Sequence, residues 1–248
     1  MENQAFPRYD YRVQPREVDL TKKATIIALG DYILHSAGED ADRIGFGIRQ
    51  MQNDNTTWVL SRMAIEVERL PDEYESYTIS TWVSEINRLM TTRNFIVEDA
   101  QGRRIAAATT NWAMIDMRTR LPLDLRDNIR YSEALIPVAC PIDRAARIAR
   151  IGGSLRDSHR IRYSDIDFNQ HTNSMKYIQW MIDTLPLEKL TDRKMKRLDI
   201  NFIHETRYGQ QVAIFGEETP EADLFEIRLA ENDTPVCKAS FRWSDPQR

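Results

Sequence analysis

The spacing of apolar residues along the chain predicts a long helix followed by a run of strands, and it does so twice. Apolar positions recur with helical spacing over 24–36 and again over 173–185. Elsewhere apolar and polar residues alternate, as they do in half-buried strands. The strands are expected at 57–69, 76–85, 93–99 and 104–116 in the first half, and at 159–163, 197–205, 211–218, 224–230 and 236–243 in the second.

Both halves end in a strand, a short turn and a strand that carries a tryptophan. The turns at 99–102 and 231–233 contain Gly, Asn and Asp, which tolerate tight backbone geometry. Trp112 and Trp243 occupy matching places in the two closing strands. One helix followed by antiparallel strands, repeated once, predicts an α+β protein built from two similar units.

The segment between the halves has the composition of a connector. It carries four arginines around a glycine pair: Arg144, Arg147, Arg150, Arg156 and Gly152-Gly153. The glycine pair predicts a flexible break, and a charge run of this kind is ordinarily solvated. We therefore expect an N-terminal unit over 1–140, a basic linker over 141–157 and a C-terminal unit over 158–248.

Polar side chains gather where the second half passes from strand to helix. Asp167, Asn169 and His171 alternate there, so they can converge on one spot. A helix cap needs one such side chain, whereas the segment offers five: Asp165, Asp167, Asn169, His171 and Asn173. Free N–H groups near Thr172 and Asn173 would add the positive end of the helix dipole. The pattern favours a site for an anion or a polarised carbonyl group.

This stretch, read through to Tyr177, resembles the second half of the fatty acyl-ACP thioesterases of plant plastids and bacteria, whose pattern is roughly D-x-D-x-N-x-H-x-N-N-x-K-Y. Further matches at 58–63, 111–112 and 116–122 extend the resemblance from about Tyr11 to Trp243. The resemblance implies a double hotdog fold, in which two tandem repeats each wrap an antiparallel sheet around a central helix. It also implies a thioester hydrolase that releases free fatty acid from acyl-ACP.

The same family carries a Glu on the next long strand, and Glu205 matches it. In plant members a Cys often follows that Glu, whereas this chain has Thr206, which argues against a thiol nucleophile. Glu205, or His171 in partnership with it, is the candidate general base for a water molecule. A covalent acyl intermediate on Asp167 or Glu205 stays an alternative to direct attack by water.

The remaining members of the cluster can be placed against the same chemistry. Asn169 suits the water or the carbonyl oxygen, because a carboxamide both donates and accepts without titrating. Asp167 is interpreted as orienting its neighbours, and burial would make it an acid–base group in its own right. The N–H groups of Thr172 and Asn173 are the expected donors to the oxyanion.

In the family the first repeat supplies the acyl pocket. The candidate lining residues here are Leu29, Ile33, Met63, Ile65 and Val67. The partner implied is acyl carrier protein with its phosphopantetheine-linked acyl chain. Its acidic surface would face the linker arginines together with Lys22 and Lys23 or with the basic cluster at 193–197.

Two other classes of protein fit parts of the pattern. One is a different hotdog enzyme, such as an acyl-CoA thioesterase or a hydratase. The other is a non-catalytic acyl-binding protein, in which the polar cluster only caps the helix. The state of assembly is left open, with a homodimer as one expectation.

Composition narrows the setting. Of 248 residues 42% are hydrophobic and 29% charged, and the net charge of −4 argues against binding nucleic acid. No apolar run approaches the roughly 20 residues of a membrane span, and the first residues lack a signal-peptide pattern, so we expect a cytoplasmic protein.

Side chains outside the cluster are given no chemical role. Cys140 and Cys237 have no metal-ligand spacing, so we expect two reduced, structural thiols, no metal and no cofactor. His35, His159 and His204 are left outside the predicted site.

Overall fold

The computed structural model of the protein describes residues 6–127 and 134–244. Within it the chain divides into two compact units, Met1–Ala145 and Ala146–Arg248, and each is described by itself. The finer division into 1–140, 141–157 and 158–248 stays a prediction. Among the described residues, no helix has both the length and the apolar character needed to cross a bilayer.

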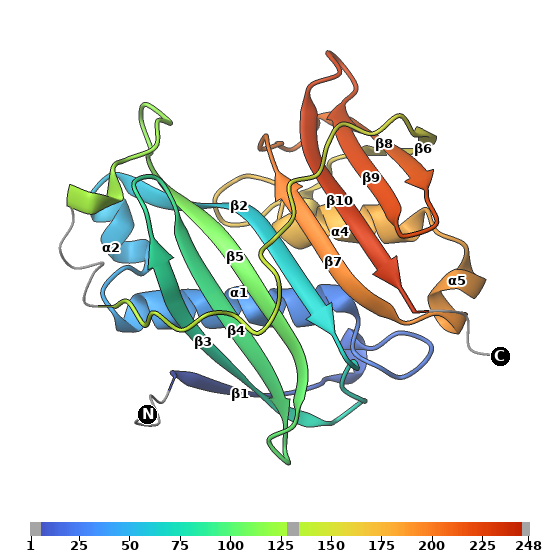
Figure 1. Cartoon of the computed structure of the whole chain (residues 1–248). Helices are drawn as coiled ribbons and strands as arrows, with labels where there is room; N and C mark the ends of the chain where they lie inside the picture. Colours follow the sequence, from blue (N-terminus) through green and yellow to red (C-terminus); the bar gives the residue numbers. More distant parts are fainter. Residues whose placement is uncertain (1–5, 128–133, 245–248) are drawn as a thin grey trace. The chain divides into compact units, whose positions relative to one another are not determined.

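The first unit packs one long helix against an antiparallel sheet (Figure 1). Its strands lie in the order β1-β3-β4-β5-β2. The elements are β1 (Arg8–Arg12), η1 (Pro15–Glu17), α1 (Ile26–Arg43), α2 (Ile48–Asn53), β2 (Thr56–Val67), β3 (Ser76–Ile86), β4 (Thr91–Asp99), β5 (Arg104–Asp116) and η2 (Leu125–Asp127).

The core of this unit lies between α1 and the sheet. The five residues expected to line an acyl pocket, Leu29, Ile33, Met63, Ile65 and Val67, are all buried in it. The helix continues past its predicted end at residue 36 and carries Asp40, whose buried carboxylate accepts from Arg93 (2.6 Å) and from Arg43 (2.7 Å). A buried charge requires such partners.

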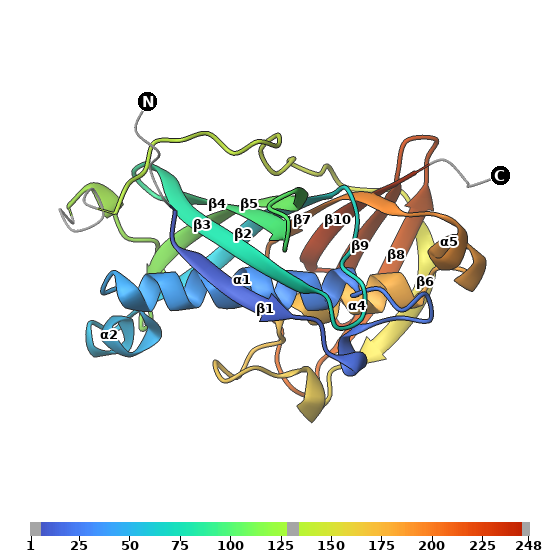
Figure 2. The same cartoon turned by 90° about the horizontal axis from the view of Figure 1, so that it is seen from below.

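The second unit repeats the architecture. Its strands lie in the order β6-β8-β9-β10-β7. This is the order of the first unit with β1 to β5 replaced by β6 to β10 in turn. Figure 2 shows a helix along one face of the sheet in each unit, α1 in one and α4 in the other. The elements are β6 (Ser154–Arg160), η3 (Tyr163–Asp165), α4 (Ser174–Asp183), α5 (Leu187–Asp192), β7 (Met195–Phe202), β8 (Gln211–Glu218), β9 (Asp223–Leu229) and β10 (Pro235–Trp243).

The expectation for the cysteines agrees with this packing. Neither Cys140 nor Cys237 forms a disulfide. Cys237 is fully buried on β10, and burial raises the pKa of its thiol well above the ordinary value. It packs as a small apolar side chain.

The expected flexible linker is instead bound to the second sheet. The backbone N–H of Ala146 donates to Asp199 Oδ1 (2.9 Å), and that of Ile148 donates to Asn201 Oδ1 (2.9 Å). Strand β6 begins at Ser154, inside the range expected as linker.

Of the glycine pair in this segment, Gly153 is closely packed, whereas Gly152 has open space around it. A Cβ atom on Gly153 would lie 2.5 Å from the carbonyl oxygen of Gly216, so a side chain has no room there. The expectation of a flexible break is wrong, because carboxylate and amide groups of the sheet hold the backbone of this segment. Its arginine side chains are exposed to solvent, as expected.

Candidate active site

The predicted polar cluster lies on the loop between η3 and α4. The N–H of Asp167 donates to the carbonyl oxygen of His171 (2.8 Å), and the N–H of Gln170 donates to the carbonyl oxygen of Asp167 (3.0 Å). Gln170 has φ 66°, the left-handed conformation that closes the turn. Oδ1 of Asp167 accepts from the N–H groups of Asn169 (2.8 Å) and His171 (3.4 Å). The Asp167 carboxylate therefore shapes the loop that carries the other polar groups.

The loop brings His171 to Glu205. Nε2 of His171 lies 3.3 Å from Oε2 of Glu205, and the two side chains are 18% and 36% exposed. Glu205 does not lie on the strand as expected, because β7 ends at Phe202 and irregular backbone follows. An imidazole and a carboxylate in this relation can take up and return a proton at a site that water can reach.

Asn169 has a different setting from its two neighbours. Its side chain is exposed, and its side-chain carboxamide forms no hydrogen bond with any other residue that the structure describes. The amide is therefore open to an incoming group, where it can donate to a carbonyl oxygen or hold a water molecule.

Three buried hydroxyl groups lie directly behind the His171–Glu205 pair. Thr206 Oγ1 is 2.7 Å from Thr172 Oγ1 and 2.9 Å from the Tyr177 hydroxyl. Burial raises the pKa of Tyr177, so this hydroxyl keeps its proton. Because Thr172 follows His171 and Thr206 follows Glu205, this hydroxyl cluster joins the two segments that carry the pair. Sequence reasoning missed it, since Thr206 was considered only as the absence of a thiol.

The expected oxyanion donors are not available. The N–H of Thr172 donates to the carbonyl oxygen of Thr206 (2.9 Å), and the N–H of Asn173 donates to that of Asp165 (2.8 Å). Asn173 is the N-cap of α4, and its Oδ1 accepts from the N–H of Met175 (2.8 Å). The prediction that these two N–H groups stabilise an oxyanion is wrong, because backbone carbonyl groups already occupy them.

His159, which was left outside the predicted site, has a polar partner after all. Its Nε2 lies 2.9 Å from Oδ2 of the buried Asp165, and its ring lies tilted against that of Trp180 with centroids 4.3 Å apart. The same carboxylate oxygen accepts from the N–H of Arg162 (2.7 Å). This contact fixes the start of the loop. No local pattern could have shown it, because Trp180 comes from the helix beyond the loop.

The same backbone turn precedes α1 in the first unit. The N–H of Asp19 donates to the carbonyl oxygen of Lys23 (3.0 Å), and Oδ1 of Asp19 accepts from the N–H of Thr21 (2.8 Å). Lys22 has φ 59°, as Gln170 has 66° in the second unit. Counting back from the N-caps Thr25 and Asn173 places Lys23 where His171 stands.

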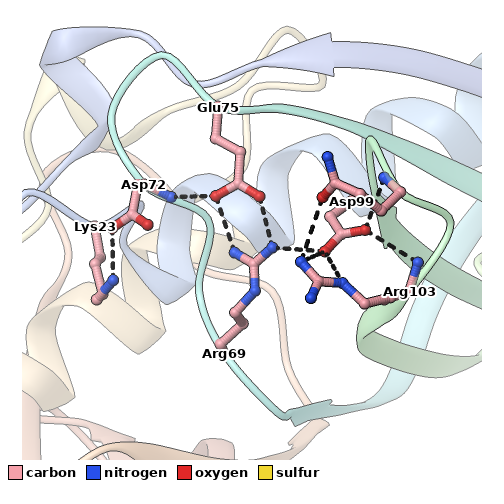
Figure 3. Close-up of polar contacts among 7 residues, drawn as sticks. Lys23, Arg69, Asp72, Glu75, Asp99 and Arg103 are labelled. Carbon is pink, nitrogen blue, oxygen red and sulfur yellow. Dashed lines mark hydrogen bonds and ion pairs between the residues drawn. The ribbon is translucent and has the colours of Figure 1, made fainter.

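The partners of the first turn are of another kind. Lys23 Nζ forms an ion pair with Asp72 (2.5 Å), within the contacts drawn in Figure 3. The hydroxyl cluster is missing there, because Ala24 corresponds to Thr172 and Leu29 corresponds to Tyr177. The N–H of Ala24 donates to the carbonyl oxygen of Pro71 (2.8 Å), as the N–H of Thr172 donates to that of Thr206. The turn is thus common to both units, whereas the imidazole, its carboxylate and the hydroxyl cluster occur in the second alone.

Known proteins match the chain along its length. The acyl-ACP thioesterase N-terminal domain matches residues 5–132, and the acyl-ACP thioesterase C-terminal domain matches residues 148–245. An acyl-ACP thioesterase structure from Bacteroides thetaiotaomicron is 33% identical, with a TM-score of 0.90 over 96% of this chain and 98% of that one. The 12:0-ACP thioesterase of Umbellularia californica has a TM-score of 0.84 at 20% identity over 97% of both chains, a likeness of fold.

Curated plant relatives are more distant in sequence. A chloroplastic acyl-[acyl-carrier-protein] hydrolase of Cuphea viscosissima is 26% identical over 81% of this chain and 52% of its own length. A chloroplastic oleoyl-acyl carrier protein thioesterase of Arabidopsis thaliana is 27% identical over 91% of this chain and 67% of its own length. The chain thus spans about half to two thirds of these relatives. The structural likenesses confirm the expected α+β hotdog fold, and the two matched domains show that the chain belongs to the acyl-ACP thioesterase family.

Proposed function

We propose that the protein hydrolyses the thioester of a fatty acyl-ACP and releases free fatty acid and the thiol of the carrier. The observation that carries the proposal is the His171–Glu205 pair, with 3.3 Å between Nε2 and Oε2, on a loop whose open side carries Asn169. Family membership supports the substrate class, since the curated relatives are named for acyl-ACP hydrolysis.

In the proposed mechanism water attacks the thioester carbon directly. Glu205, with His171 beside it, takes a proton from the water as the oxygen bonds to carbon. The carbonyl oxygen gains negative charge, and the exposed amide of Asn169 donates to it. When the C–S bond breaks, the proton held by the pair passes to the leaving thiolate. Asp167 acts indirectly, by holding the loop in which Asn169 and His171 lie.

A covalent route through a carboxylate is a distinct version of the same reaction. In it Glu205 or Asp167 attacks the thioester and water then hydrolyses the mixed anhydride. A single turnover in ¹⁸O-labelled water distinguishes the two routes. Direct attack places the label in the fatty acid only, whereas hydrolysis of an anhydride can also leave it in the enzyme carboxylate, where mass spectrometry of the peptides detects it.

The reaction itself is tested by thiol release from a panel of acyl-ACP, acyl-CoA and enoyl substrates without added metal or nucleotide. Hydrolysis of acyl-ACP in preference to acyl-CoA supports the proposal. Preference for acyl-CoA would favour the other thioesterase class, and hydration of an enoyl substrate would favour a hydratase. Folded protein that binds acyl chains but releases no thiol would identify a binding protein. The cytoplasmic location and the homodimer stay predictions.

A further inference from the structure

Half of the basic groups first considered for carrier docking already have partners. Arg144 pairs with Glu85 (2.8 Å) and Arg150 with Asp233 (3.1 Å). The others with partners are Lys23 on Asp72, Arg156 on the carbonyl oxygen of Gly216, and the buried Arg197 on Asp199. Paired cations contribute little attraction to an acidic protein. Lys22, Arg147 and the other cations of the 193–197 cluster form no ion pair with another described residue. Further arginines without an ion pair lie in the segments next to the candidate site.

Exposed arginine and aromatic side chains lie in the segments next to the His171–Glu205 pair. Tyr163, Phe168 and Tyr208 are 88%, 67% and 70% exposed, which is unusual for large apolar rings. Arg160, Arg162 and Arg207 are exposed as well, and none of them forms an ion pair with another described residue. We call these six residues the arginine-aromatic rim.

Backbone hydrogen bonds bring the members of the rim together. Gly209 donates to Ile161 (3.0 Å) and Ile161 to Gln210 (2.9 Å), which places the segment after Arg160 beside the segment after Arg207. The bond from Thr172 to Thr206 joins the loop that carries Phe168 to the same segment. The rim therefore forms one continuous border of the site.

The residues of the first unit that correspond to the rim can be compared with it, because the first unit lacks the His171–Glu205 pair. The N–H of Asp72 donates to Glu75 Oε2 (2.8 Å) as the N–H of Arg207 donates to Gln210 Oε1 (2.7 Å), so Asp72 corresponds to Arg207. By the same correspondence the position of Tyr208 holds Glu73. Counting back from the N-caps of α1 and α4, the position of Arg162 holds Gln14 and that of Arg160 holds Arg12. Acidic residues therefore stand in the first unit where Arg207 and Tyr208 stand in the second, whereas Arg160 has a basic counterpart.

We propose that the arginine-aromatic rim is the surface on which the acidic carrier protein docks. The three guanidinium groups meet carboxylates of the carrier and the phosphate of its phosphopantetheine arm. The exposed rings pack against the apolar part of the carrier surface. The inference rests on the proposed function, because the docked carrier must deliver its thioester to the adjacent His171–Glu205 pair.

The test compares one substrate that carries the carrier with one that does not. Acyl-ACP is set against the same acyl chain on pantetheine alone, which has neither carrier nor phosphate. In the double variant Arg162→Glu/Arg207→Glu we expect KM for acyl-ACP to rise about tenfold, with kcat within about twofold, because a docking contact acts on ground and transition states alike. Kinetics on acyl-pantetheine should not change. The matched control is Arg49→Glu, the same charge change at an exposed arginine of α2.

A second variant protects the test against damage to the site. If the double reversal slows both substrates, Arg162→Gln/Arg207→Gln removes the charge without adding an acid. A rise in KM confined to acyl-ACP then supports docking on the rim. An unchanged KM for acyl-ACP, or equal effects on both substrates in the Gln variant, overturns it. An effect of Arg147→Glu on acyl-ACP with none at the rim would also overturn it, in favour of the segment before β6.

Failure of the proposed function is distinguished by direct binding. Calorimetric titration with a carrier bearing a non-hydrolysable, amide-linked acyl chain needs no turnover. One outcome is that the wild-type protein hydrolyses none of the substrates, yet binds this carrier, and that the double variant binds it about tenfold more weakly. In that case the proposed function is refuted and the proposed docking surface is supported. Absence of binding to the wild-type protein, or equal binding to both, overturns the docking surface.

Discussion

The turn before α1 and the turn before α4 have the same backbone conformation but different side-chain partners. In the first unit the turn leads into a series of ion pairs: Lys23 with Asp72, Arg69 with Glu75 (2.6 Å) and Arg69 with Asp99 (3.0 Å), shown in Figure 3. In the second unit His171 meets Glu205 at 3.3 Å, and the surrounding arginines and rings are left exposed.

The difference separates what the fold needs from what the chemistry needs. The carboxylates Asp19 and Asp167 accept the same backbone N–H bonds, so they belong to the turn. The imidazole, its carboxylate and the hydroxyl cluster occur only in the second unit, so we assign them to the proposed reaction.

The largest expected effect comes from removing the carboxylate of the second turn. Glu205→Gln keeps the shape of the side chain but loses the base, so kcat should fall by roughly 10²-fold or more. Circular dichroism checks the fold and thiol release from acyl-ACP checks the rate. Retention of most activity by the folded variant would mean that another group activates the water.

The hydroxyl cluster should show a smaller effect. Thr206→Val keeps the volume but leaves the buried hydroxyls of Thr172 and Tyr177 without their shared partner, which costs about 1–3 kcal/mol in the free energy of unfolding. The pair would be held less closely, and we expect kcat to fall about tenfold. Thr206→Ser keeps the hydroxyl and should retain most activity. Wild-type kcat in the valine variant would show that the cluster has no part in positioning.

The two turn aspartates sharpen the comparison further. Asp167→Asn keeps an oxygen that accepts the N–H groups of Asn169 and His171, so kcat should fall only about threefold, whereas Asp167→Ala should cost more. Asp19→Ala should lower the free energy of unfolding by about 0.5–2 kcal/mol and leave kcat unchanged. Asparagine and alanine variants of Asp167 that are equally inactive would instead assign Asp167 a chemical step.

The smallest effect concerns stability and pH in the first unit. Burial alone would raise the pKa of Asp99, but bonds from Arg103 and Arg69 outweigh it and hold the pKa well below its ordinary value. The folded pKa therefore lies below the unfolded value of about 3.9, so the stabilisation is present above that pH and is lost as pH falls through the folded pKa.

Chemical unfolding of the wild-type protein and Asp99→Asn from pH 7 to pH 2 measures this contribution. The variant should be less stable at pH 7, and the gap should narrow below about pH 4. A gap that is independent of pH would mean that the carboxylate charge is not what stabilises this end of the sheet.

How much of this the sequence could predict depends on where each strand lies. Strands β5 and β8 both occur at the predicted residues. β8 alternates between buried and more exposed positions, whereas β5 contains a continuous buried run, and both patterns are typical of strands. Strand β6 was expected at 159–163 and occurs at Ser154–Arg160, because almost all its residues are exposed at the edge of the sheet. β1 was missed for a similar reason, since its burial alternates only between exposed and half-buried.

Within the site, local contacts were predictable and distant ones were not. Asp167, Asn169 and His171 lie within five residues, so the turn that gathers them could be predicted from their spacing. The position of Glu205 came from the family resemblance. The hydroxyl cluster and the occupied N–H of Thr172 depend on Thr206, 34 residues further along, and no local pattern reports such a contact.

The most direct test of the account is kcat for acyl-ACP hydrolysis in two variants at the corresponding place in the two turns, His171→Ala and Lys23→Ala. The account predicts that the first lowers kcat by roughly 10²-fold or more and that the second leaves it within about twofold, because only the second unit holds the acid–base pair. Equal rates in the two variants, or a larger loss from Lys23→Ala, would contradict the assignment of the reaction to His171 and Glu205.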